Sequence, residues 1–148
     1  MACLQWQRAL VAPEEIAASV RASDCTLGIF GTSAKAARVV PYKIYQAMAC
    51  ARPIVTSDTV AARTYLVDDE NCVLVPPGDP EALADALARL QQDPALRTRL
   101  AESAGLSYRE QMSHAPMREA SARGSWGLFL IHISEPPRPY STLYAVFL

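Results

Sequence analysis

Three cations lie close together in the stretch GIFGTSAKAARVVPYKIYQAMACARP, residues 28–53: Lys35, Arg38 and Lys43. Lys43 follows Pro41 by two residues, where a helix is expected to begin. The start of a helix carries partial positive charge, so a cation there is unfavourable unless an anion binds beside it. The spacing therefore indicates a local anion site, and a phosphate or diphosphate is the chemistry that suits it.

The residues around these cations could complete such a site. Gly31 permits a sharp turn and close approach of a ligand, and Thr32 and Ser33 offer hydroxyl groups. The segment 31–66 has one acid, Asp58, against five cations: Lys35, Arg38, Lys43, Arg52 and Arg63. The alternative is that these cations are solvated surface side chains. Neither of the phosphate-binding motifs G-x-x-x-x-G-K-[ST] and G-x-G-x-x-G occurs.

The composition of the chain restricts the class of protein. Its 148 residues are 51% hydrophobic and 20% charged, as in globular proteins. A net charge of −1 gives no general attraction to nucleic acid or to an anionic membrane, so any anion site must be local. We expect no bound metal, because D-x-D and C-x-x-C are absent, and the scattered cysteines suggest reduced thiols of a cytoplasmic protein. No apolar run reaches the ~18 residues of a membrane span.

Up to about residue 113 the pattern predicts alternating helices and strands. Pro13 opens the first helix, and two later helices begin at Asp79-Pro80 and Asp93-Pro94, where an aspartate can cap the helix and proline takes its first position. Gly78 and Asp79 are interpreted as turn and cap. The remaining expected elements are strands at 25–30, 53–57 and 72–76, a helix at 42–50 and a short helix at 60–66.

This alternation predicts an α/β fold, a parallel sheet flanked by helices on both faces. Ligands of such sheets bind beyond the carboxyl ends of the strands. The loop after the strand at 25–30, which carries the cations, lies at such a place.

The chain changes character after residue 113. Residues 114–148 have neither helical periodicity nor alternation, and prolines interrupt them. The pattern indicates a domain at 1–113 and an irregular tail at 114–148. The tail either docks on the core or is not native protein, because FLIHISEPPRPY resembles translated sequencing-adapter DNA. His114 and His132 lie in this tail and are given no catalytic role.

Two blocks carry a family resemblance: LGIFGTSAKAARVVPYKIYQAMACARPIVTSDT and LVDDENCVLVPPGDPEALADALARLQQDPALRTRLAESA. Over about residues 5–113 the chain resembles the C-terminal, donor-binding domain of family 4 glycosyltransferases, which are two-domain GT-B enzymes with retaining, metal-independent chemistry. The resemblance implies a partial Rossmann-like half of such an enzyme. It also implies that a UDP- or GDP-linked sugar donor binds at these residues, with its diphosphate at the loop and helix start: Gly31, Thr32, Ser33, Lys35, Arg38, Lys43 and Gln46.

Several positions depart from the family pattern. The family's Glu-x7-Glu signature falls on Arg38 and Gln46, so the position of the glutamate that contacts the transferred sugar holds a cation. Gln46 can still bond the ribose hydroxyls, and Arg38 could pair with a phosphate or an acidic sugar. The catalytic residues are therefore unknown. Ala51 replaces a usual glycine, Tyr42 a usual asparagine, and Thr64 a frequent glutamate.

The resemblance implies an enzyme that transfers a sugar to a lipid- or polysaccharide-linked acceptor. It further implies an N-terminal acceptor-binding domain as partner, absent from this chain, and a cytoplasmic location that is at most peripheral to the inner face of the membrane. Without that domain the chain alone is expected to be inactive. Two alternatives stay open: a non-catalytic α/β module that binds a phosphorylated partner, and a fragment of a GT-B-like sugar-nucleotide epimerase.

Overall fold

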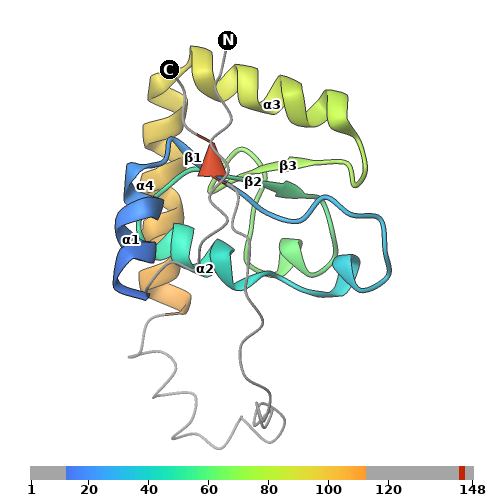
Figure 1. Cartoon of the computed structure of the whole chain (residues 1–148), viewed down its shortest axis with the longest axis horizontal. Coiled ribbons are helices and arrows are strands. Elements are labelled where there is room, and N and C mark those ends of the chain that lie inside the picture. The colour runs from blue at the N-terminus through green and yellow to red at the C-terminus, as the bar shows by residue number, and fades with distance from the viewer. Residues whose placement is uncertain (1–12, 113–143, 146–148) are drawn as a thin grey trace, which may run out of the picture.

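The computed structural model describes residues 13–112 and 144–145, and Figure 1 shows their arrangement. The helices are α1 (Pro13–Ala22), α2 (Tyr42–Ala49), α3 (Pro80–Gln92) and α4 (Pro94–Gln111), with short 3-10 helices η1 (Ala36–Arg38) and η2 (Ala62–Thr64). The strands are β1 (Cys25–Leu27), β2 (Ile54–Ser57), β3 (Val73–Val75) and β4 (Tyr144–Ala145). Among the described residues, no helix has the length and apolarity that a membrane span requires.

The sheet has the order β3-β2-β1-β4. β1 pairs in parallel with β2 at Thr26↔Ile54, and β2 pairs in parallel with β3 at Thr56↔Leu74. The expected parallel α/β sheet is therefore confirmed for these three strands. β4 is the exception, because it runs antiparallel to β1. The rest of the predicted tail lies outside the described residues.

Helices cover both faces of the sheet, as the alternation predicted. α1 and α2 pack on one face, in a core that includes Val20, Ile44 and Met48. α3 packs on the other face, in a core that includes Val55 and Leu90. In Figure 1, α4 runs past the sheet from the α3 side to the α1 and α2 side, and its residues contribute to both cores.

The helix starts follow the predicted caps. Asp79 accepts hydrogen bonds from the backbone N–H groups of Glu81 and Ala82 at 3.0 and 2.9 Å, and Asp93 accepts one from Leu96 at 2.9 Å. The interpretation of Gly78 and Asp79 as turn and cap agrees with this geometry, since Gly78 has a φ of +73°.

Two predicted elements are shorter than expected. The helix at 60–66 is only the 3-10 turn η2, in which the Thr59 hydroxyl accepts a hydrogen bond from the Ala62 N–H at 3.1 Å. The strand at 25–30 ends at Leu27. The next residue, Gly28, passes so close to Thr56 that a Cβ on it would lie 2.0 Å from the Thr56 hydroxyl oxygen.

The outer edge of β3 is covered by the segment that precedes it. The Asp68 carboxylate accepts a hydrogen bond from the Leu74 N–H at 2.8 Å, and the Asp69 N–H donates to the Cys72 carbonyl at 2.9 Å. Arg89 of α3 pairs with Asp69 at 2.6 Å. This turn, expected at 68–70, therefore satisfies backbone groups that an edge strand would otherwise expose.

Candidate functional site

The carboxyl ends of the three parallel strands meet on the right of Figure 1, where the loops that follow them come together. The Gly78 N–H donates to the Phe30 carbonyl at 2.9 Å, and a Cβ on Gly78 would lie 2.7 Å from the Thr32 side chain. The Ser57 hydroxyl donates to the Ile29 carbonyl at 2.5 Å. The base of the loop after β1 is thus held by the last residue of β2 and by the loop that follows β3.

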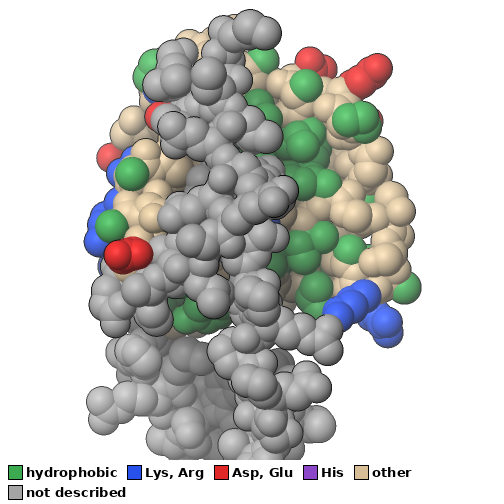
Figure 2. Space-filling view, in the orientation of Figure 1, with side chains coloured by type: hydrophobic (Ala, Val, Ile, Leu, Met, Phe, Trp, Pro, Cys, Tyr) green, Lys and Arg blue, Asp and Glu red, His purple; other side chains and the backbone are tan. Residues whose placement is uncertain are grey.

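The part of this loop that carries Lys35 and Arg38 is a self-contained turn on the surface. Ser33 accepts a hydrogen bond from the Ala36 N–H through its side chain at 3.2 Å, and from the Ala37 N–H through its carbonyl at 3.1 Å. The Lys35 and Arg38 side chains are exposed. Figure 2 shows Lys and Arg side chains projecting from the lower right of the molecule, where Figure 1 draws η1.

The backbone at Gly31 does not adopt a conformation that requires glycine. Gly31 is not among the residues with positive φ, and a Cβ on it would meet nothing closer than the Ala36 Cβ at 3.8 Å. Gly31 and Thr32 are both exposed. Close approach of a ligand at Gly31 stays a prediction.

The start of α2 is where the sequence placed it. Pro41 is the N-cap residue, with φ −68° and ψ 146°, and no side chain caps the helix. The first N–H groups of α2 therefore have no side-chain acceptor, as in helix starts that bind anions.

Lys43 lies in this uncapped first turn and is only partly exposed. Burial lowers its pKa below the usual 10.5, because the charged ammonium loses solvation. Gln46 follows three residues later, on the same side of the helix, and is also partly buried. An anion bound beside this turn would supply the negatively charged partner that Lys43 lacks.

Two of the five counted cations do not belong to the candidate anion site: Arg63 is paired with an acid, and Arg52 lies at the other end of the strands. Arg63 binds both carboxylate oxygens of Asp58, at 2.5 and 2.6 Å, and this contact lowers the pKa of Asp58. Arg52 follows the end of α2 and precedes β2, so it lies at the amino ends of the strands. The ion pairs among the described residues leave Lys35, Arg38 and Lys43 without an acidic partner.

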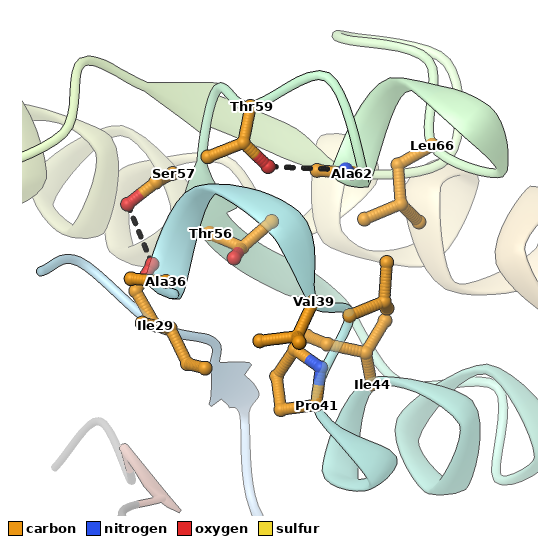
Figure 3. A pocket seen from close by; sticks show the side chains of 11 residues that line it. Ile29, Ala36, Val39, Pro41, Ile44, Thr56, Ser57, Thr59, Ala62 and Leu66 are labelled. Carbon is orange, nitrogen blue, oxygen red and sulfur yellow. Dashed lines mark hydrogen bonds between the residues drawn. The ribbon is translucent and has the colours of Figure 1, made fainter. Parts of the chain in front are cut away.

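A small pocket lies beneath this loop. Figure 3 shows its mainly apolar walls; it is lined by Ile29, Ala36, Val39, Val40, Pro41, Ile44, Thr56, Ser57, Thr59, Ala62 and Leu66. The hydroxyls of Ser57 and Thr59 are engaged in internal hydrogen bonds, the dashed lines in Figure 3. None of the three unpaired cations lines this pocket, so the candidate anion site and the apolar pocket adjoin without coinciding.

Three polar residues at this edge of the sheet were not predicted as part of the site: Thr56, Ser57 and Thr59. Their signal was their place at the end of a strand, where parallel sheets bind ligands. Within residues 13–112 and 144–145, no group of three or more His, Cys, Asp or Glu could hold a metal ion. His114 and His132 lie outside the described residues.

Comparison with known proteins adds to this geometry. A family model described as "Glycosyl transferases group 1" matches residues 11–93. The phosphatidyl-myo-inositol mannosyltransferase of Mycobacterium leprae is 41% identical over 85 residues, which are 56% of this chain and 21% of that protein. The D-inositol 3-phosphate glycosyltransferase of Xylanimonas cellulosilytica is 42% identical over 64 residues, 43% of this chain and 15% of that protein. The chain thus matches about a fifth or less of the length of these relatives.

Solved structures show the same fold. The C-terminal domain of a glycosyl transferase group 1 family protein from Francisella tularensis aligns with a TM-score of 0.59 and 24% identity, over 73% of this chain and 53% of that one. Sucrose-phosphate synthase from Thermosynechococcus elongatus aligns with a TM-score of 0.51 and 24% identity, over 57% of this chain and 22% of that one.

Proposed function

The chain belongs to the group 1 glycosyl transferases, and on that premise we propose that it is the donor-binding part of a retaining glycosyltransferase. It binds the diphosphate of a UDP- or GDP-linked sugar at the carboxyl ends of β1 and β2. The sugar passes to a lipid- or polysaccharide-linked acceptor. That acceptor is held by an N-terminal domain outside this chain, and the chain alone does not catalyse transfer.

The observation that carries the proposal is Lys43 in the uncapped first turn of α2. Its position is unfavourable in the free protein on two counts, because the helix start is positive and burial removes water from the ammonium. A bound diphosphate offsets both effects, because its negative charge favours the charged ammonium. The proposed site includes Gly31, Thr32, Ser33, Lys35, Arg38, Lys43 and Gln46.

The remaining residues have proposed roles that follow from their chemistry. Lys43 and the N–H groups of α2 neutralise the diphosphate, so no metal ion is required. Gln46, one turn further along α2, accepts hydrogen bonds from the ribose hydroxyls. Thr32 and Ser33 offer hydroxyls to the same anion, from a loop that Gly78 holds in place.

The proposed acceptor class draws on the relatives. Their names specify phosphatidyl-myo-inositol and D-inositol 3-phosphate as what those proteins act on. The first name supports a lipid-linked acceptor, whereas the second names a small phosphorylated inositol, so the polysaccharide-linked alternative rests on the family resemblance alone. A lipid-linked acceptor would place the enzyme in the cytoplasm, at or near the inner face of the membrane.

The chain contains only two lysines, Lys35 and Lys43, which permits a direct test. Reductive methylation with 13C-formaldehyde labels both side chains and the N-terminal amine, and each gives a separate NMR signal. We expect UDP or GDP to shift the Lys43 signal and to raise its pKa, because an adjacent anion favours the charged amine. Binding should weaken as salt is added.

Substitutions locate the site. Lys43→Ala should weaken nucleoside diphosphate binding by ~1–2 kcal/mol, the scale of a charge-assisted hydrogen bond. Arg21→Ala is the matched control, since it removes an exposed cation from the far end of α1. Gln46→Ala should weaken UDP and leave pyrophosphate unchanged. If the Lys43 signal does not shift at tens of millimolar UDP and GDP, the cations are solvated surface side chains and do not form an anion site. If pyrophosphate binds but nucleoside diphosphates do not, the proposal that this site binds a nucleotide-sugar donor is wrong.

A further inference from the structure

Positive charge remains at the site after a diphosphate is accounted for. Asp58, the one acid between residues 31 and 66, is fully engaged by Arg63. Among the described residues, the ion pairs leave three cations of the segment 31–43 without an acidic partner. Lys43 and the start of α2 are sufficient to bind a diphosphate. The positive charge of the turn 33–38 is then not needed for the diphosphate.

Arg38 is the cation of that turn whose side chain is held in place. Its Nε donates to the Ala34 carbonyl at 3.0 Å, and its N–H donates to the Lys35 carbonyl at 3.2 Å. The hydrogen bonds that Ser33 accepts close the same turn. Because Nε is used, the guanidinium is oriented while its two terminal nitrogens stay available in a planar pair, the arrangement that suits both oxygens of a carboxylate.

Arg38 also stands at the edge of the pocket. Its neighbours Ala36 and Val39 both line the pocket, whereas the Arg38 side chain is exposed. Val39, Val40 and Pro41 connect it to the first turn of α2. A ligand whose diphosphate lies at that turn could therefore extend its next group, the sugar, toward Arg38.

We infer that Arg38 determines specificity by binding a carboxylate on the donor sugar, so that the donor is a nucleoside diphosphate uronic acid. This inference rests on the proposed function. A neutral hexose would leave the oriented guanidinium without an anionic partner, while a uronic acid adds one carboxylate of matching geometry. The pair is exposed to solvent, so the expected preference is modest, about fivefold in Kd.

The test measures binding of matched donors to the full chain by the 13C-methyl-lysine signals. The probes are UDP-glucose against UDP-glucuronic acid, and GDP-mannose against GDP-mannuronic acid, with UDP and GDP as references. We expect the uronic acid of at least one pair to bind about fivefold more tightly than its neutral partner. Arg38→Gln should remove that preference, which is read as the ratio of the two Kd values within each donor pair, so that any change in affinity for the shared UDP or GDP part cancels.

Two further variants sharpen the result. Arg38→Lys keeps the charge and loses the planar pair of donors, so it should retain only part of the preference. Arg21→Gln changes the net charge equally at a distant surface and should retain all of it. Far-UV circular dichroism checks that each variant is folded, which is expected because Arg38 is exposed.

The possible results distinguish a failure of this inference from a failure of the proposed donor-binding function. Equal affinity for neutral and acidic donors, with UDP or GDP still bound, overturns the role of Arg38 and leaves the donor site intact. A preference that survives Arg38→Gln also overturns it. Failure of every nucleotide to bind overturns the proposed function, and the inference falls with it.

Discussion

Ala51 is the position at which one substitution should make this chain more stable. The residue follows the end of α2 with a φ of +49°, in the left-handed region. The Ala51 N–H donates to the Met48 carbonyl and the Arg52 N–H to the Ala47 carbonyl, each at 3.0 Å, so the helix ends in a Schellman motif. Ala51 occupies the position of that motif where glycine is usual.

The magnitude follows from two opposing effects. Left-handed backbone costs a residue with a Cβ roughly 1–2 kcal/mol, which Ala51→Gly removes. Glycine is more flexible in the unfolded chain, which takes back about 0.4–1 kcal/mol. We expect Ala51→Gly to stabilise the fold by about 0.5–1 kcal/mol.

Gly105 of α4 supplies a second, coupled test. A Cβ on Gly105 would lie 3.1 Å from the Ala51 Cβ, tighter than most real contacts. In the original chain Gly105→Ala gains about 1 kcal/mol of helix propensity, but overpacking against Ala51 opposes it by roughly 1–3 kcal/mol. In the Ala51→Gly background the opposing atom is gone, so Gly105→Ala should become stabilising.

Urea unfolding of the four chains, followed by far-UV circular dichroism at 25 °C, measures this cycle. The coupling between Ala51→Gly and Gly105→Ala should be about 1 kcal/mol, well above the ~0.3–0.5 kcal/mol within which independent sites add. Additive effects would show that the two positions do not press on each other. A destabilising Ala51→Gly would show that the end of α2 does not adopt the left-handed geometry in solution.

Two other predictions concern the site and its support. Lys43→Met should raise the free energy of unfolding near neutral pH in the absence of a ligand, because burial of the charged ammonium destabilises the fold and lowers the pKa of Lys43. This destabilisation is complete below the pKa of Lys43 in the folded chain, and it is relieved as the pH rises from that value toward 10.5. Urea midpoints of both chains from pH 7 to 10.5 should therefore converge, and a constant gap would contradict this account. Gly28→Ala should destabilise by at least ~1–3 kcal/mol, because its Cβ would lie 2.0 Å from the buried Thr56 hydroxyl oxygen. Gly31→Ala is the control, since its Cβ meets only Ala36 at 3.8 Å, and equal urea midpoints for the two variants would rule out the close approach.

Local signals in the sequence sufficed for the helices. The Asp-Pro pairs at 79–80 and 93–94 predicted the starts of α3 and α4 because the cap and the fixed φ of proline act within a few residues. The 60–66 segment was harder, since its turn depends on the Thr59 side chain and on burial of Leu66 against the core. A sequence pattern does not specify which of several competing turns the core selects.

At the candidate site the sequence predicted the start of a helix but not the ion pairs of the nearby cations. Pro41 and Lys43 indicated the helix start, and the structure has α2 begin there. The pairing of Arg63 with Asp58 was not predicted, because it depends on how the chain turns after β2. Counting cations along the sequence therefore overstated the free charge. The oriented side chain of Arg38 could not be foreseen either, since its bond to the Ala34 carbonyl exists only once η1 has formed.

The Asp68 carboxylate on the Leu74 N–H has a consequence for self-association. Growth of a β-fibril requires that each added molecule present a new unpaired edge, as well as bind through an old one. The Asp68 carboxylate occupies a hydrogen-bonding group on the outer edge of β3, so this edge is not open to another strand. At the other end of the sheet, β4 pairs with β1. Edge-to-edge association through this sheet would therefore stop after a single addition instead of propagating.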